Sequence, residues 1–491
     1  MKTIIILMDS LNRHYLNCYG ESWVQTPNID RLAERGMVFD NHFAGSLPCM
    51  PARRDLFTGR LNFLETPWSP LQPFDECLVR ELRKQRSTYS HMVTDHFHYF
   101  EWQGMGYHTG FNTWEFIRGQ EGDHWHPRVQ DPDIPVYRGK NRRQDWVNRS
   151  VMDLEREEDY PTPQTFMRAI DFLKHNYDQD NWHLHVEAFD PHEPFLCPQK
   201  YVDMYGDTWD DRYHFDWPSY EQVDTEHEGE EAIQHIRKCY AGTLTMADAW
   251  LGKLMDTMDE LDLWKDTAVI LTTDHGHLLG ENGYWAKNYM FDYAKLAHIP
   301  LIVYSPHAKE NSKRVHALTT MIDLMPTVME FHGAVPSQNV QGKSLVHLLK
   351  GNSSHHDAVL YGYFGKDINL TDGRYTYCLQ PLEGSTVHHH TAMPVGAMSD
   401  PERYANAEVG RFLKQTQMPV YRFPVPSRRH HNGTGSPLLY DLVEDPEQQT
   451  PICDQELEER MKSKMEELLV RYDAPASQYV RMGISKWRDR H

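Results

Sequence analysis

Cys49, Pro51 and Arg53 are the residues of this chain whose types and spacing are best suited to chemistry. Pro51 favours a first helical position, because its missing N–H costs nothing there, so we expect a helix that begins just after Cys49. Free N–H groups and the positive end of the helix dipole would stabilise a thiolate, an alkoxide or a bound oxyanion at residue 49. If the helix begins this early, Arg53 lies alongside Cys49 and can hold an anionic group.

Asp9, Asp274 and His275 are further candidates, because each follows an apolar, β-prone run. Such runs are typical of parallel strands buried on both faces, and ligands of open α/β sheets bind at the carboxyl ends of the strands. These three side chains could therefore meet Cys49 at one edge of a sheet. Carboxylates and a neutral imidazole suit Ca²⁺, Mg²⁺ or Mn²⁺. For each aspartate the alternative is a helix cap.

The elements that must position these residues alternate between strand and helix, which predicts an α/β fold with a large, mostly parallel sheet sandwiched by helices. The expected strands are 3–8, 88–94, 182–189, 267–273 and 300–304, and the expected helices are 27–35, 75–86, 163–177, 230–262 with an interruption left open, and 319–332. Short β-prone runs at 358–364, 375–379 and 438–442, then a helix at 454–472, predict a smaller C-terminal α+β domain. We place the domains at 1–352 and 353–491.

Composition and charge restrict the partners and the compartment. The formal net charge of −21 argues against a nucleic-acid or anionic-membrane partner, because such partners need a basic surface. The apolar run 3–8 is too short for a signal peptide or a membrane span, so we expect a cytoplasmic protein. The 7 cysteines are odd in number and scattered without a Cys-x-x-Cys pair, which argues against a disulfide framework or a zinc ribbon.

The segment Cys49-Met50-Pro51-Ala52-Arg53 resembles the Cys-x-Pro-x-Arg signature of type I sulfatases, which belong to the alkaline phosphatase superfamily. In that family the cysteine is converted to formylglycine, and the hydrate of this aldehyde supplies the nucleophile. Further segments that resemble motifs of the family are 26–33, 190–195, 274–276, 283–287, 321–327 and 438–442. The resemblance implies an alkaline phosphatase-like fold and a formylglycine-generating maturation enzyme as a partner. It also implies a small anionic ester substrate, such as a sulfated sugar, and is compatible with a homo-oligomer.

The resemblance also implies roles for individual residues. One divalent metal, Ca²⁺ in first place with Mn²⁺ or Mg²⁺ as alternatives, would be held by Asp9, Cys49, Asp274 and His275. Cys49, Arg53, His98, His192 and Lys287 would be catalytic, and His96 would bind substrate. In the family's mechanism one hydroxyl of the hydrate attacks sulfur, while His192 or Lys287 protonates the leaving oxygen. A base, which we assign to His98, then deprotonates the second hydroxyl so that sulfate leaves.

This chain departs from the family pattern at two places that bear on chemistry. Many sulfatases have Asp-Asp where this chain has Asp9-Ser10, and some have Asn where His275 stands, so the metal would have one carboxylate fewer. Where many sulfatases read Gly-Lys-Trp-His, this chain reads Asp-His-Phe-His, which replaces a lysine by His96 and retains His98.

Two other functions remain open on sequence alone. Relatives with phosphonate monoester or phosphodiester hydrolase activity share the fold and the nucleophile, and can carry a lone aspartate after the first strand. A sulfate monoester and a phosphodiester both carry one negative charge, so the charges of the pocket do not separate them. A non-catalytic binding protein with unmodified Cys49 is a third interpretation, which the intact set of candidate residues disfavours.

Overall fold

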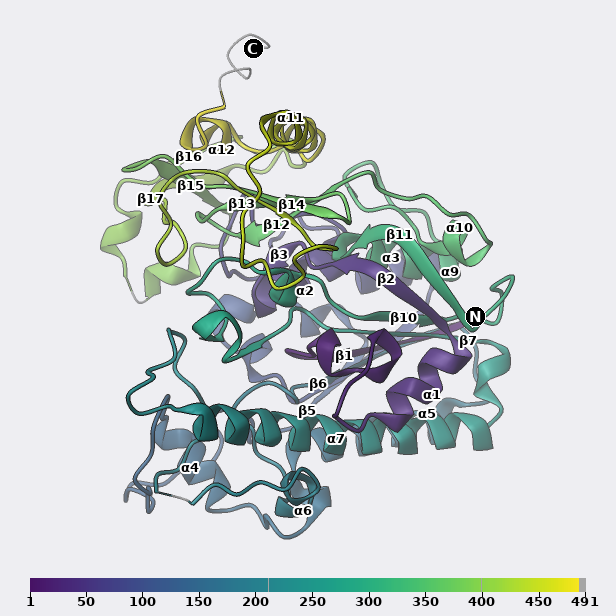
Figure 1. Ribbon diagram of the computed structural model, residues 1–491. Coiled ribbons are helices and arrows are strands. Elements are labelled where there is room, and N and C mark those ends of the chain that lie inside the picture. Colours follow the sequence, from purple (N-terminus) through teal and green to yellow (C-terminus); the bar gives the residue numbers. More distant parts are fainter. Residues whose placement is uncertain (211, 399, 485–491) are drawn as a thin grey trace.

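The computed structural model describes residues 1–210, 212–398 and 400–484, and its centre is an eight-stranded sheet (Figure 1). The strand order is β11-β2-β10-β7-β1-β6-β4-β5. In that order the strands span Lys313–Thr320, Met37–Phe43, Leu301–Tyr304, Thr267–Thr272, Lys2–Met8, Trp182–Ala188, Tyr89–Thr94 and Thr113–Phe116. β1 is parallel to β6 and β7, whereas β10 is antiparallel to both of its neighbours. The expected large, mostly parallel sheet is confirmed.

Helices cover both faces of this sheet. Ile4 and Ile6 of β1 belong to one apolar cluster, whereas the alternating Ile5 and Leu7 belong to another. The first cluster includes side chains of α1 (Pro27–Arg35), α5 (Pro161–Asn176) and α7 (Glu230–Glu260), and the second those of α2 (Cys49–Thr58), α3 (Leu78–Arg86) and α9 (Leu324–Phe331). Figure 1 shows the long α7 lying along the sheet close to α1 and α5. A continuous apolar strand such as β1 is stable only when both of its faces are covered in this way.

A smaller sheet forms the C-terminal part of the molecule and connects directly to Cys49. Its order is β18-β14-β13-β12-β3, with strands Leu438–Asp441, Tyr375–Leu379, Ile368–Thr371, Val359–Tyr363 and Ser46–Leu47. β3 pairs with β12 in parallel and lies immediately before α2. The C-terminal sheet therefore anchors the start of the helix that carries Cys49. The boundary at 352/353 stays a prediction.

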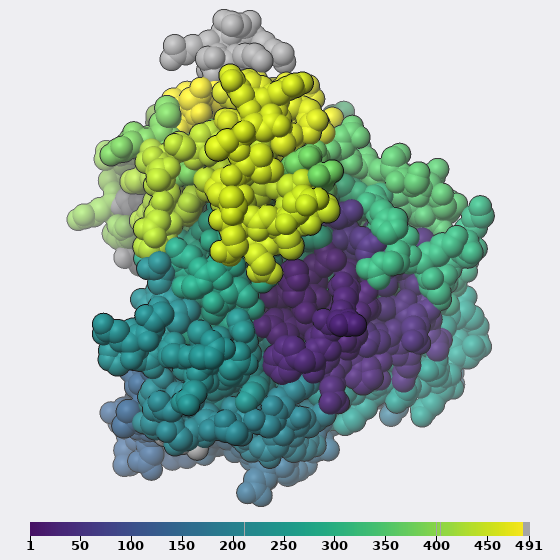
Figure 2. All heavy atoms as spheres, in the orientation of Figure 1, coloured from purple at the N-terminus to yellow at the C-terminus, as the bar shows by residue number. Residues whose placement is uncertain are grey.

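The remaining elements are short or peripheral. They are the three-stranded sheet β15-β17-β16 (Thr386–Thr391, Val420–Pro426, Glu408–Gly410), the pair β8 (Leu278–Leu279) and β9 (Trp285–Ala286), and helices α4 (Arg143–Arg149), α6 (Gln199–Asp203), α8 (Ala294–Ala297), α10 (Val346–Leu349), α11 (Gln455–Arg471) and α12 (Ala476–Arg481). Figure 2 shows the C-terminal residues, in yellow, lying against the N-terminal residues, in purple. Within the described residues no helix combines the length and the apolar composition needed to cross a membrane.

Three predicted helices differ from the structure in ways that have local causes. The expected helix at 319–332 is wrong at its start, because Thr319 and Thr320 end β11; the helical segment begins at Met321, and Asp323 accepts from the N–H of Thr320 in its capping box. The expected helix at 75–86 begins only at Leu78, since Asp75 is paired with Arg54. The interruption left open in 230–262 does not occur, and α7 is continuous.

Candidate active site

Four potential metal ligands meet at the edge of the large sheet. Asp9 directly follows β1, Asp274 and His275 follow β7, and Cys49 begins α2. One ligand atom from each of these residues lies within 4.8 Å of the other three, and all four residues are buried. We call these residues the active-site cluster. The predicted convergence of the strand ends with Cys49 is therefore present in the structure.

The ring of His275 is oriented so that one nitrogen is free to bind a ligand. Its Nδ1 lies 2.9 Å from the carbonyl oxygen of Gly276, to which it donates, so Nε2 carries the lone pair. Nε2 lies 3.2 Å from Sγ of Cys49. Burial lowers the pKa of His275 and so favours the neutral imidazole that a metal requires. A backbone carbonyl on the second nitrogen is a common way to orient a metal-binding histidine.

Arg53 is surrounded by three carboxylates. Its guanidinium donates to Asp274 at 2.6 Å, to Asp9 at 2.8 Å and to Glu187 of β6. Burial would raise the pKa of Asp9, but the charges of Arg53 and Lys287 lower it overall, so this carboxylate stays ionised. Besides lying close to Cys49, Arg53 therefore stabilises the carboxylates of Asp9 and Asp274, which would otherwise repel one another.

The thiol of Cys49 is not activated in this environment. α2 begins at Cys49 itself, so Pro51 occupies the third helical position and not the first, as the sequence had suggested. Burial, with the nearby charge of Asp9, raises the pKa of Cys49 well above its usual range. The expected thiolate is therefore disfavoured, and an unmodified Cys49 would be a weak nucleophile.

Lys287 reaches the cluster through a tight turn after β9. Its Nζ donates to Oγ of Ser10 at 3.1 Å, and Ser10 in turn donates to Asp9 at 2.8 Å. The residues on either side, Ala286 and Asn288, both have positive φ angles of 62° and 79°. Such angles are uncommon for residues with a Cβ, and are often retained where a side chain must be presented to a functional site. Burial opposes the charge of Lys287, but the negative groups around it raise its pKa, so it is a cation here.

His192 lies near Lys287 on the turn that follows β6. Its Nδ1 donates to the carbonyl oxygen of Glu193, which leaves Nε2 as the nitrogen that can carry a transferable proton. Burial lowers the pKa of His192 to about 3, so the ring is neutral in the free protein. The carboxylate of Glu193 is held by Tyr220 and lies 2.9 Å from Nε2 of His277. Its negative charge would favour protonation of His192 when substrate arrives.

The two histidines after β4 have opposite electrostatic environments. Nδ1 of His96 lies 3.9 Å from Asp9, and neither ring nitrogen has a hydrogen-bond partner within the described part of the chain. His98 instead contacts Glu101 at 2.7 Å and Glu121 at 3.1 Å. Burial lowers the pKa of His96, with the charge of Arg53 adding to this effect, whereas hydrogen bonds to the two glutamates outweigh burial and raise the pKa of His98. His96 is therefore neutral, and His98 favours the imidazolium.

Several residues of the site were not predicted from the sequence. They are Tyr99, Glu121, Glu187, Glu193 and Tyr220, which hold Arg53, His98 or each other. Glu187 could have been found, because a carboxylate inside a fully buried strand must have a charged partner. Glu121 and Tyr220 lie in irregular segments with no sequence pattern to mark them.

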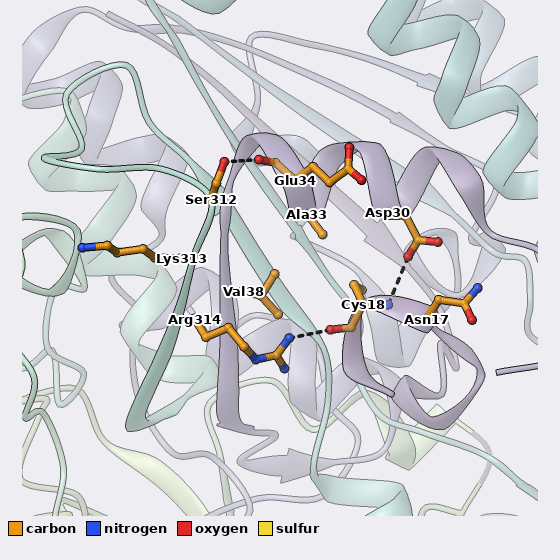
Figure 3. A pocket seen from close by; sticks show the side chains of 9 residues that line it. All are labelled: Asn17, Cys18, Asp30, Ala33, Glu34, Val38, Ser312, Lys313 and Arg314. Atoms are coloured by element: carbon orange, nitrogen blue, oxygen red, sulfur yellow. Dashed lines mark hydrogen bonds between the residues drawn. The ribbon is translucent and has the colours of Figure 1, made fainter. Parts of the chain in front are cut away.

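A surface pocket of about 620 Å³ lies apart from these residues (Figure 3). It is lined by Asn17, Cys18, Asp30, Ala33, Glu34, Val38, Ser312, Lys313 and Arg314. Two of its polar side chains are already paired, since Asp30 accepts from the N–H of Cys18 at 3.1 Å and Arg314 donates to the carbonyl oxygen of Cys18 at 2.7 Å. This pocket contains none of the predicted site residues.

Carboxylates, an imidazole and a helix N-terminus at the carboxyl edge of the sheet form an arrangement suited to binding a metal and an anionic ester. A sequence model of the family described as "Sulfatase" matches residues 2–334. The chain therefore belongs to the sulfatase family. It is similar to a protein described as "Arylsulfatase" from Clostridium perfringens (strain 13 / Type A), with 23% identity over 409 residues that cover 74% of this chain and 82% of the relative.

Two solved structures share the fold over almost the whole chain. One is a phosphonate monoester hydrolase of Agrobacterium radiobacter, with a TM-score of 0.68, 19% identity, and coverage of 96% of this chain and 95% of the other. The second was solved in complex with its substrate D-glucosamine-2-N,6-O-disulfate, with a TM-score of 0.66, 16% identity, and coverage of 96% and 98%. At these identities the likeness establishes the fold.

Proposed function

We propose that this sulfatase-family hydrolase cleaves sulfate monoesters of a sugar or an aryl alcohol, and that its nucleophile is a formylglycine derived from Cys49. The observation that carries the proposal is the environment of residue 49. Residue 49 begins α2 beside two carboxylates, where the unmodified thiol stays protonated. A hydrated aldehyde at the same position needs no thiolate, and its second hydroxyl gives a route to release the product.

The active-site cluster fits one divalent metal, with Asp9, Asp274, His275 and residue 49 as ligands. With Sγ replaced by oxygen, the donor set contains oxygens and one imidazole nitrogen, which suits Ca²⁺, Mg²⁺ or Mn²⁺. We place Ca²⁺ first because carboxylate oxygens predominate. The bound metal supplies positive charge that offsets the charge of the transferring group and acidifies the hydroxyl of residue 49.

The chain's own residues then bind the ester and move protons. Lys287 is a buried cation that can hold an anionic ester oxygen, and His96 offers a neutral ring beside Asp9 for a further contact. His192, once it has taken up a proton at Nε2, or the cation Lys287 would protonate the leaving oxygen. His98 accepts the proton of the second hydroxyl of residue 49, and Glu121 stabilises the imidazolium that forms.

A phosphonate monoester or phosphodiester hydrolase is the second candidate function. It is favoured by the likeness in fold to the phosphonate monoester hydrolase, and by Ser10 in place of a further carboxylate. The sulfated-sugar substrate of the other solved structure supports the first candidate.

A panel of matched esters tests the proposal. Nitrophenyl sulfate, a nitrophenyl phosphonate, a nitrophenyl phosphodiester and a sulfated monosaccharide are compared by kcat/KM, on protein whose residue 49 has been identified by peptide mass spectrometry. We expect the highest kcat/KM for a sulfate monoester. A clear preference for the phosphodiester or the phosphonate would promote the second candidate, and an active enzyme with only unmodified Cys49 would refute the formylglycine.

A further inference from the structure

Asp323, His355 and His356 form a second group of ligand-type side chains, outside the active-site cluster. One ligand atom from each of these residues lies within 4.8 Å of the other two. The side chains of Asp323 and His355 are completely buried, and that of His356 is 1% exposed. We call these residues the junction cluster. Asp323 immediately precedes α9, a helix that packs on the large sheet, and the histidines lie in the segment that leads into β12 of the smaller sheet.

The three side chains have the spacing of ligands around a small cation. Nε2 of His356 lies 3.0 Å from both carboxylate oxygens of Asp323, and Nε2 of His355 lies 3.1 Å from Oδ2. Zinc binds nitrogen and oxygen at about 2.0–2.2 Å, so neighbouring ligands of a tetrahedral site are about 3.3 Å apart. The observed separations are within a few tenths of an ångström of that value.

The carboxylate is already oriented by the backbone. Oδ2 accepts from the N–H of Thr320 at 2.8 Å, and Oδ1 accepts from the N–H of Lys343 at 2.8 Å. These bonds hold the remaining lone pairs of Asp323 toward the two imidazoles. An oriented carboxylate and buried imidazoles are the arrangement that second-shell hydrogen bonds produce around a metal.

The two histidines have ring nitrogens without a hydrogen-bond partner of good geometry in the described chain. Both ring nitrogens of His347 face carbonyl oxygens, Nδ1 that of Ser344 at 2.8 Å and Nε2 that of Ser354 at 3.2 Å, and Nδ1 of His355 lies 3.3 Å from Nε2 of His347. Nε2 of His355 faces Oδ2 of Asp323, and this nitrogen and Nδ1 of His356 are buried without such a partner. A buried imidazole nitrogen that faces a carboxylate carries either a proton or a metal ion.

We propose that Asp323, His355 and His356 bind a transition-metal ion of the zinc class, which ties the entry of β12 to the start of α9. Imidazole and carboxylate ligands suit Zn²⁺, and a position left open by three protein ligands would hold water. His42 of β2, whose buried Nε2 also lacks a hydrogen-bond partner in the described chain, is near enough for the charge of Asp323 to act on it. The site would stabilise the junction of the two sheets and take no part in ester cleavage.

Zinc content per chain tests this site directly. The full-length protein is stripped with a chelator, incubated with Zn²⁺ and desalted, and bound zinc is measured. The wild-type protein should retain one zinc more per chain than His355→Gln/His356→Gln. Asp274→Asn, which acts on the active-site cluster, should keep the junction zinc, and His388→Gln/His389→Gln, an adjacent pair of histidines in β15, should match the wild type. Equal zinc in the wild type and a folded His355→Gln/His356→Gln variant would overturn the proposal.

Two measurements on Asp274→Asn decide the question if the double histidine variant fails to fold. Co²⁺ bound at the junction cluster should give visible d–d absorption typical of four-coordinate cobalt. Zn²⁺ in large excess over its dissociation constant should raise Tm by about 2–4 °C. If neither effect occurs, a proton occupies the position that we assign to the metal and the proposal is wrong.

Discussion

The active-site cluster and the junction cluster both bring buried aspartate and histidine together, but they differ in the charges around them. Asp9 and Asp274 are paired with Arg53, and Lys287 lies nearby. Asp323 is instead oriented by two backbone N–H groups. Side-chain cations beside a metal can also bind an anionic substrate, whereas backbone donors only orient a ligand. The comparison separates a site built for metal and substrate from one built for metal alone.

Replacement of the nucleophile should have the largest effect on activity. Cys49→Ser should abolish turnover, because serine has one hydroxyl and cannot release the product as a hydrate does. Mass spectrometry of the variant with substrate should detect a stable ester at residue 49. Cys77→Ser, which alters another buried cysteine, should keep wild-type activity, and sustained turnover by Cys49→Ser would exclude the proposed release step.

Loss of the proposed general acid should depend on the leaving group. His192→Ala should lower kcat/KM for a sulfated sugar by about 10²–10⁴-fold, because a sugar alkoxide needs a proton to leave. A nitrophenolate leaves without help, so nitrophenyl sulfate should be affected much less. Steady-state kinetics on the two esters measures the difference. Equal losses on both would transfer the role to Lys287 or His98.

Metal ligands of the two clusters should have separate effects. Asp274→Asn should reduce kcat by about a hundredfold or more, since it weakens the electrostatic stabilisation of the transferring group. His355→Gln/His356→Gln should leave kcat/KM within about twofold, because sites without shared partners act nearly independently. Activity assays with metal analysis of both variants check this. A comparable loss of activity in the histidine variant would show that the clusters are coupled.

The sequence predicted the active-site cluster because its members lie at the ends of strongly apolar runs. Asp9 and Asp274 follow strands that continuous apolar, β-prone runs identify, and Cys49 precedes a helix with a recognisable pattern. The start of that helix was misplaced, since Pro51 is compatible with more than one position in a first turn. The thiol's raised pKa depends on burial and on Asp9, neither of which is local in the chain.

The junction cluster could not be predicted in the same way. Asp323 was assigned to a helix, and the structure places it at the end of the 3₁₀ helix Met321–Asp323, which continues directly into α9, so this position gave no sign of a ligand cluster. The histidines lie in a segment without periodicity, and their contact with Asp323 follows only from the packing of one sheet against the other. Strand order, including the antiparallel β10, likewise depends on long-range pairing that no local pattern records.

The smallest expected effect concerns one histidine of each site, His98 and His355. His98 lies between Glu101 and Glu121, as His355 lies between Asp323 and His347, but both glutamates can accept from a protonated ring. Hydrogen bonds to the glutamates outweigh burial and raise the pKa of His98, so the neutral base forms only as pH rises through that value. We therefore expect an acidic limb in the pH profile of kcat.

Glu121→Gln removes a negative charge that stabilises the imidazolium of His98, so it should lower this pKa and move the acidic limb of kcat by about one pH unit toward lower pH. Profiles of kcat against pH for the wild type and Glu121→Gln measure the shift, and Glu115→Gln, at an exposed glutamate, should leave the limb in place. A limb that stays where it is, or moves toward higher pH, would remove His98 from the role of base. If the limb moves as expected, His98 serves its site by binding a proton, whereas His355 is proposed to serve its own by binding a metal.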